Sequence, residues 1–184
     1  RKQLNFIFCQ YEKFDFENKI WTIDGNLIID RHSKFKGCTF NFTENGSISF
    51  GKHPSVTSMI GPGPIWVTFE NCTFIGCNDD YWQGITYNVS SVDNGPVLSI
   101  INSTIKNAET GLKILTTNRF NGRLNLNTVT FDNNNIGAHF VGPFSMKEYI
   151  LSDCQFKNGD IGIQVDDFPR NDDPLSTHRA IIFD

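Results

Sequence analysis

The chain has 184 residues, of which 39% are hydrophobic and 13% aromatic, and this apolar content argues against a disordered chain. Its formal net charge is −4, and because acidic and basic residues are interspersed, there is no basic stripe for a nucleic-acid backbone. No apolar segment is long enough to span a membrane.

Residue usage favours strands and turns over helices. Seventeen Phe supply most of the aromatic content, whereas Ala, the best helix former, occurs only at Ala108, Ala138 and Ala180. Asn is abundant, and it favours turns and left-handed backbone positions. Since no stretch has the apolar periodicity of a helical face, the predicted fold class is all-β.

Residues 1–30 contain two short segments in which apolar residues alternate. LNFIF, near the start, is predicted as a strand or a cap. IWTIDGNLIID has Ile23 as the anchor of one strand and Leu27 and Ile29 in the next. We therefore expect an N-terminal coil or cap over 1–30.

From residue 31 onward one plan recurs along the chain. Five segments end in an apolar anchor, and the steps between anchors are 34, 31, 26 and 25 residues. The anchors are Phe40, Phe74, Ile105, Phe131 and Phe156. A glycine follows most anchors after six residues, and apolar alternation then resumes. Each unit therefore predicts three short strands separated by turns.

The stretches between units carry Gly, Pro and Asn, and so they do not supply the helical crossovers of an ordinary parallel sheet. Parallel pairing remains available if each unit is one turn of a solenoid, because equivalent residues then stack about 4.8 Å apart. Such stacking explains why one column repeats one residue type. An antiparallel sandwich is the alternative, although it does not require like residues at one period.

The units SKFKGCTF, VTFENCTF, LSIINSTI, LNLNTVTF and YILSDCQF resemble the coils of right-handed parallel β-helix proteins of the pectin-lyase-like kind. The match covers residues 33–165. The resemblance implies a right-handed solenoid with three short strands per coil and about 25 residues per regular coil. It implies no single function, because unrelated activities use such solenoids.

At the other end of the sequence, RAIIFD resembles the start of a further coil, with Ile181 and Phe183 in the apolar places. A solenoid needs capped ends, because uncapped ends expose strand edges and core. We therefore expect the coils of 31–184 to continue beyond the C-terminal end, in a longer chain.

Several recurring polar residues have a structural interpretation. Glycosylation sequons begin at Asn41, Asn45, Asn71, Asn88 and Asn102. For Asn71 and Asn102, a tight turn before the next strand explains the asparagine, and glycan attachment is the alternative. Stacked amides of Asn107, Asn133 and Asn158 are predicted to hydrogen-bond from coil to coil. An outward Thr column before the anchors suits exposed strands, with ice binding as a weaker alternative.

Five cysteines are too few, and too odd in number, for a disulfide scaffold. Cys38, Cys72 and Cys154 fall at inward positions, where we expect small core residues with free thiols. A disulfide between Cys38 and Cys72 in neighbouring coils is the alternative. Cys77 has no nearby His or Cys pair to complete a zinc site.

Loops are the first places to look for a binding site, because rigid scaffolds place binding residues there. The insertion CNDDYWQG holds Asp79, Asp80, Tyr81 and Trp82, which suit a sugar-stacking platform or, through the paired carboxylates, a calcium site. A larger insertion, GKHPSVTSMIGPGPIW, precedes it. A solvated insertion without a ligand is the alternative.

The acidic loop DDFPRNDDPLSTHR follows the last complete unit. Its Asp166, Asp167, Arg170 and His178 are candidate ligand-binding residues, since carboxylate, guanidinium and imidazole groups suit acid–base work and polar binding. No cofactor is predicted, and calcium bound by the paired carboxylates is the alternative.

Two classes of function follow from this organisation. A polysaccharide lyase or glycoside hydrolase, which the resemblance permits, needs a carboxylate cluster projecting into one groove, and the outward strand positions contain none. We therefore assign no catalytic residue. We favour a non-catalytic, adhesin-like β-helix segment at the cell surface or outside the cell, which contacts a glycan or a surface protein through its loops.

Overall fold

The computed structural model describes residues 14–50, 65–77, 80–89, 97–116, 123–142 and 149–166. This part of the chain contains eighteen β-strands and no α-helix. The strands form three parallel sheets of six strands each. Within each sheet, every strand except the last pairs with the strand three places further along the chain.

The three sheets differ in which part of each coil they contain. Sheet A consists of β1 (Phe14–Glu17), β4 (Ser33–Lys36), β7 (Trp66–Glu70), β10 (Val97–Ile101), β13 (Arg123–Asn127) and β16 (Tyr149–Ser152). Sheet B consists of β2 (Ile20–Ile23), β5 (Thr39–Phe42), β8 (Thr73–Gly76), β11 (Thr104–Lys106), β14 (Thr130–Asp132) and β17 (Gln155–Lys157). Sheet C consists of β3 (Asn26–Ile29), β6 (Ser47–Phe50), β9 (Gly84–Val89), β12 (Thr110–Thr116), β15 (Ile136–Val141) and β18 (Ile161–Asp166).

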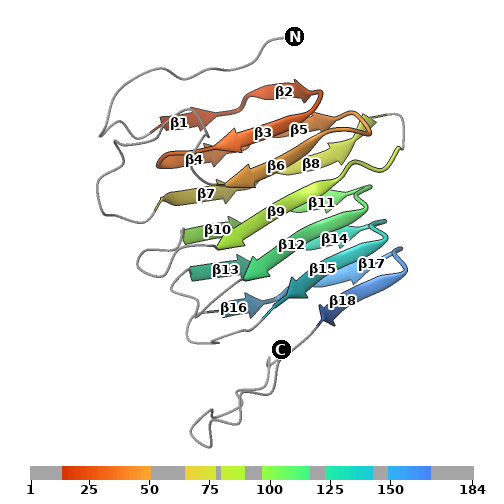
Figure 1. Cartoon of the computed structure of the whole chain (residues 1–184). Helices are drawn as coiled ribbons and strands as arrows, with labels where there is room; N and C mark the ends of the chain where they lie inside the picture. Colours follow the sequence, from red (N-terminus) through yellow and green to blue (C-terminus); the bar gives the residue numbers. More distant parts are fainter. Residues whose placement is uncertain are drawn as a thin grey trace, which may run out of the picture.

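The strand order describes one chain that coils around a common core. From β1 the chain passes to β2 and β3, returns to sheet A at β4, and repeats this path through β18 (Figure 1). The protein is a right-handed parallel β-helix with three strands per coil. The predicted solenoid is therefore confirmed. No helix in the described ranges is long and apolar enough to cross a membrane.

The predicted anchor column is also confirmed, because its five members face one another in consecutive strands of sheet B. In the first coil the predicted anchor is wrong. Trp21 pairs with Phe40, whereas Ile23 pairs with Phe42. The indole of Trp21 stacks on the Phe40 ring with centroids 4.8 Å apart, so the larger aromatic side chain continues the aromatic column.

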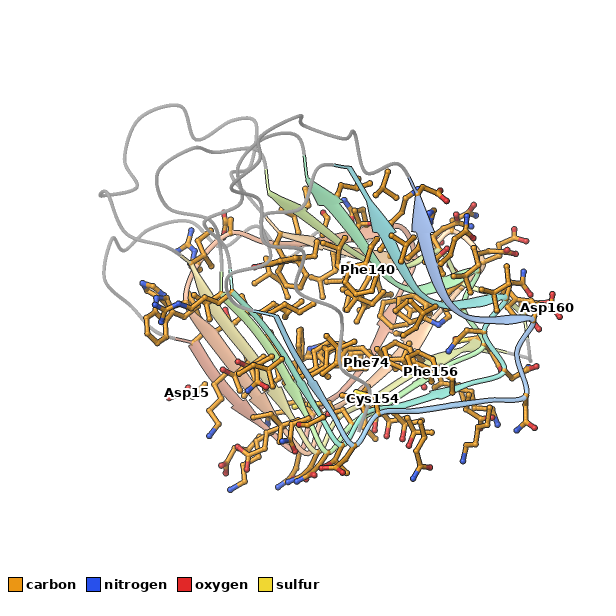
Figure 2. The ribbon with its side chains drawn as sticks, turned by 90° about the horizontal axis from the view of Figure 1, so that it is seen from below. Asp15, Phe74, Phe140, Cys154, Phe156 and Asp160 are labelled. Carbon is orange, nitrogen blue, oxygen red and sulfur yellow. The ribbon has the colours of Figure 1, made fainter. Side chains whose placement is uncertain are left out.

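Inward side chains of the three sheets fill the interior, as the view along the coils shows (Figure 2). In sheet A, the ring of Phe35 stacks on Phe16 at 5.1 Å and on Phe69 at 4.9 Å between centroids. In sheet B, Phe40 stacks on Phe74 at 5.0 Å, and Phe35 meets Phe40 edge-on at 5.5 Å. Two aromatic columns therefore run along the core and contact each other, which removes much apolar area from water.

The turn between sheets A and B has a left-handed residue in successive coils. Its φ is 54° at Asn71 and 48° at Asn102, a region that Asn adopts more readily than most residues. The prediction that these two sequon asparagines occupy a tight turn is confirmed. The same place holds Gly37, with φ 62°, and the β-branched Thr128, with φ 55°.

A second left-handed position, between sheets B and C, carries the predicted asparagine ladder. Asn107, Asn133 and Asn158 have φ values of 55°, 52° and 55°. Asn133 Nδ2 donates to Asn107 Oδ1 at 2.8 Å, so this rung is confirmed. Asn158 Nδ2 donates instead to Asp132 Oδ1, also at 2.8 Å. The ladder therefore ends on a carboxylate.

Candidate functional site

The CNDDYWQG insertion places its predicted ligands in different surroundings. Asp79 lies outside the described residues. Asp80 is exposed, and its backbone N–H donates to the carbonyl of Cys77 at 3.0 Å, which closes a tight turn. Tyr81 is half-buried, and its hydroxyl donates to Asn133 Oδ1 at 3.3 Å. The tyrosine is thereby fixed against the asparagine ladder.

Trp82 has no accessible surface and does not serve as a stacking ring for a sugar. Its indole lies on the Phe42 ring, with centroids 3.9 Å apart and planes 6° from parallel. Its Nε1 donates to the Lys106 carbonyl at 2.9 Å, and its backbone forms a parallel bridge with Ala108. The insertion therefore returns to the core, and the expectation of an exposed Trp82 is wrong.

Asp166 is the other candidate residue that the structure describes, and it lies beside a buried histidine. His139 Nε2 is 2.6 Å from Asp166 Oδ2, and Gln164 Nε2 donates to Oδ1 and Oδ2 at 3.0 and 3.2 Å. The Gln164 amide first, and His139 next, lower the pKa of Asp166, with Lys113 adding a smaller attraction. Asp167, Arg170 and His178 lie outside the described residues.

This polar group, formed by Lys113, His139, Gln164 and Asp166, lies on the outward face of sheet C. Lys113 faces His139 across β12 and β15, and His139 faces Gln164 across β15 and β18. His139 is nevertheless only 9% exposed. The sequence shows the column but not the burial of its imidazole, and for this reason His139 is absent from the predicted site.

The cysteines take the structural role that was predicted for them. Cys38, Cys72 and Cys154 have free thiols, and Cys38 and Cys72 are buried. Burial raises the pKa of Cys72 to about 11, so the thiol stays protonated at neutral pH. The Cys72 thiol donates to the Phe35 carbonyl at 3.4 Å. The Cys38–Cys72 disulfide alternative is therefore not supported.

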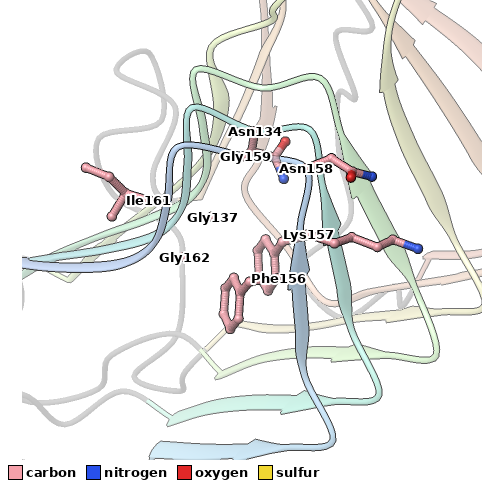
Figure 3. A pocket seen from close by; sticks show the side chains of 9 residues that line it. Asn134, Gly137, Phe156, Lys157, Asn158, Gly159, Ile161 and Gly162 are labelled. Atoms are coloured by element: carbon pink, nitrogen blue, oxygen red, sulfur yellow. The ribbon is translucent and has the colours of Figure 1, made fainter.

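A hollow opens beside the last described coil, between Phe156, Gly159 and Gly162 (Figure 3). In the two preceding coils, the corresponding space beside Gly111 and Gly137 holds the anchor ring of the following coil, Phe131 and Phe156. The hollow therefore follows from the stacking pattern. Its polar lining consists of Asn134, Lys157 and Asn158, without a carboxylate or an imidazole for acid–base chemistry.

Calcium binding by the insertion stays a prediction, because Asp79 lies outside the described part of the chain. Within the described ranges, no three His, Cys, Asp or Glu residues form a group placed to hold a metal ion. No protein-family model, curated protein or solved structure matches the chain.

Proposed function

We propose that the chain is a non-catalytic β-helix segment of a cell-surface or extracellular protein, in which a rigid stack of coils supports a surface that binds a glycan or another protein. The observation that best supports this proposal is that outward lysine and glutamate side chains of neighbouring coils form ion pairs. Lys34 Nζ lies 2.8 Å from Glu70 Oε2, and Lys36 Nζ lies 3.7 Å from Glu17 Oε1. These charges are paired between neighbouring coils.

The pairing affects the protonation of both partners. The hydrogen bond and charge of Glu70 raise the pKa of Lys34, and those of Lys34 lower the pKa of Glu70. Both groups are therefore held in their charged forms at neutral pH. A general acid or base needs a pKa near the operating pH, and this pair is shifted away from it. Such ion pairs between coils suit a scaffold better than a catalytic groove.

The core supports the same role. The aromatic columns and the parallel registers continue from coil to coil. Each coil adds about 4.8 Å to the stack. Side chains on one face thus keep fixed spacings, which suits recognition of an extended ligand.

A glycan array tests this proposal together with an activity assay. We expect the folded chain to bind a subset of immobilised neutral or acidic glycans, or a purified surface protein, without releasing reducing ends or unsaturated products. Release of such products would show that the chain is an enzyme. A folded chain that binds none of these ligands contradicts the proposal.

The second candidate is a polysaccharide lyase or glycoside hydrolase, and the contact between His139 and Asp166 favours it. A histidine held by a carboxylate, with Lys113 nearby, is a combination that proton abstraction can use. Incubation with acidic polysaccharides and calcium then raises the ultraviolet absorbance as unsaturated products form. A His139→Gln variant must abolish that signal while it stays folded, and an unchanged rate removes this candidate.

A further inference from the structure

Trp66, at the start of β7, exposes a large aromatic surface. It is 55% exposed, and it is the only aromatic residue among the exposed large hydrophobic side chains of the described residues. It lies at the end of the GKHPSVTSMIGPGPIW insertion, on the outer face of sheet A. The other two described tryptophans, Trp21 and Trp82, pack into or against the core, whereas the indole of Trp66 faces solvent.

The indole borders a hollow on that face, here called the Trp66 hollow. It is lined by His32, Ser33, Lys34, Trp66 and Thr68. These residues come from β4, from β7 and from the residue before β4. Because Lys34 faces Thr68 in the parallel register, the hollow is built on paired strands. It therefore has a rigid floor.

The orientation of the imidazole follows from its hydrogen bond. The backbone N–H of Trp66 donates to His32 Nδ1 at 3.0 Å. In the neutral ring the hydrogen then resides on Nε2, which is left as a donor. His32 is exposed. The Ser33 hydroxyl donates to the Arg31 carbonyl at 3.0 Å, which holds the segment that carries the imidazole.

The charges at the hollow favour an uncharged ligand. Lys34 is the cation in the lining, and its ammonium group is 2.8 Å from the Glu70 carboxylate. The pair is compensated, so the hollow carries little net attraction for an anion. The other lining residues combine the aromatic surface of Trp66 with the hydroxyls of Ser33 and Thr68 and the imidazole of His32. Binding sites for small ligands share this mixture of apolar surface and a few polar groups.

We propose that the Trp66 hollow binds a neutral hexopyranose unit of a glycan. The apolar C–H face of such a ring packs on the indole, while its hydroxyl groups reach His32 Nε2, Lys34 Nζ and Thr68 Oγ1 at the rim. This proposal rests on the proposed binding function and names its ligand class. It also moves the sugar-stacking role from the buried Trp82 to Trp66.

Affinity measurements on five chains test the proposal: the parent, Trp66→Ala, Trp66→Phe, His32→Ala and Ile150→Ala. The probes are hexasaccharides of glucose, mannose, galactose and, as the charged comparison, galacturonic acid. Ile150 is the matched control because it is 56% exposed on the outer face of sheet A. Circular dichroism and thermal unfolding check that each variant is folded.

We expect the parent to bind at least one neutral hexasaccharide more tightly than the galacturonic acid hexasaccharide. Trp66→Ala lowers that affinity about tenfold or more, Trp66→Phe lowers it less, and Ile150→Ala changes it less than about twofold. His32→Ala lowers it as well, through the lost donor.

Each contrary result has a distinct meaning. If the parent binds neutral glycans and Trp66→Ala binds them equally well, the hollow is excluded while the binding function stands. Preference for the galacturonic acid hexasaccharide, or binding of a protein but no glycan, also overturns the hollow alone. A folded parent that binds neither glycan nor protein overturns both proposals.

Discussion

The ring of Phe131 lies against the backbone of Gly111, the glycine six residues after the preceding anchor. A Cβ atom on Gly111 would lie 2.8 Å from Phe131 Cδ1 and 2.7 Å from the carbonyl oxygen of Gly137. A Cβ atom on Gly137 would likewise lie 2.5 Å from Phe156 Cδ1. In these two coils the recurring glycine therefore leaves space for the anchor ring of the next coil.

We predict that Gly111→Ala destabilises the protein. Its methyl group overlaps backbone as well as a ring, and such overpacking costs about 1–3 kcal/mol. Gly162→Ala is the matched control, because it occupies the same column and its Cβ would have no neighbour nearer than 3.4 Å. We expect it to stay within about 0.5 kcal/mol of the parent in chemical unfolding. Equal losses would show that the glycine serves the strand backbone and not the ring.

Phe131 and Thr130 test the inward and outward assignment of neighbouring residues. Phe131 is 1% exposed and stacks on Phe156 with centroids 4.8 Å apart, so Phe131→Ala costs about 3–5 kcal/mol. Thr130 points outward from the same strand, and Thr130→Ala stays within about 0.5 kcal/mol. Unfolding in urea measures both. Similar losses from the two variants would contradict the assignment.

The anchors and turns were predictable because the repeat requires them. Once Phe74, Ile105 and Phe131 are aligned, their neighbours alternate inward and outward along each strand, and the structure follows that alternation. Left-handed turns were predictable at Asn71 and Asn102 for a chemical reason, since Asn tolerates this backbone region. The sequence predicts the structure wherever equivalent positions of successive coils need the same property, such as an inward apolar side chain or a left-handed backbone.

The candidate site was harder to predict because it lies where the repeat is broken or where burial is decisive. Trp82 follows Asp79 and Asp80, and its polar neighbours suggest an exposed loop, yet it stacks on a ring forty residues earlier in the chain. The contact between His139 and Asp166 joins neighbouring strands diagonally, two residues out of register. It is visible in the sequence only after the coil register is known.

We predict that a substitution of Thr128 stabilises the protein. Thr128 is a β-branched residue at φ 55°, in a column that elsewhere holds Asn, Gly or Asp. Because left-handed backbone costs such a residue about 1–2 kcal/mol, we expect Thr128→Asn to raise the free energy of unfolding by about 1 kcal/mol. The variant creates an Asn-Val-Thr sequon, so it is produced in a host that does not glycosylate.

The control for this substitution is Thr130→Asn, two residues further on and within β14. There Asn replaces a favourable strand residue, and the expected effect is a loss of up to about 1 kcal/mol. Thermal unfolding of the two variants should therefore shift in opposite directions. A decrease for Thr128→Asn would mean that the left-handed turn is not strained by threonine.

Substitutions of Trp82 test whether this residue serves core packing or ligand binding. Trp82→Ala removes the stack on Phe42 and costs about 3–5 kcal/mol. Trp82→Phe keeps a ring at that place but leaves the Lys106 carbonyl without its indole donor, which costs about 1–3 kcal/mol. We expect the folded Trp82→Phe variant to retain the glycan affinity of the parent. A specific loss of affinity at unchanged fold would return Trp82 to the binding site.

Because the pKa of Asp166 is lowered in the folded protein, we predict that the stability of the protein depends on pH. The Gln164 amide first, and His139 next, lower this pKa, so the unfolded chain binds the Asp166 proton more readily. The stabilisation is present above the ordinary aspartate pKa of about 4, and it is lost as the pH falls through the lower, folded value. At pH 7 we expect Asp166→Asn to unfold at a lower temperature than the parent. The difference should shrink between about pH 5 and pH 3, because protonation then removes the same charge from the parent. Thermal unfolding of both chains across this range measures it, and a difference that does not change with pH would mean that the lost stability comes from packing and not from the carboxylate charge.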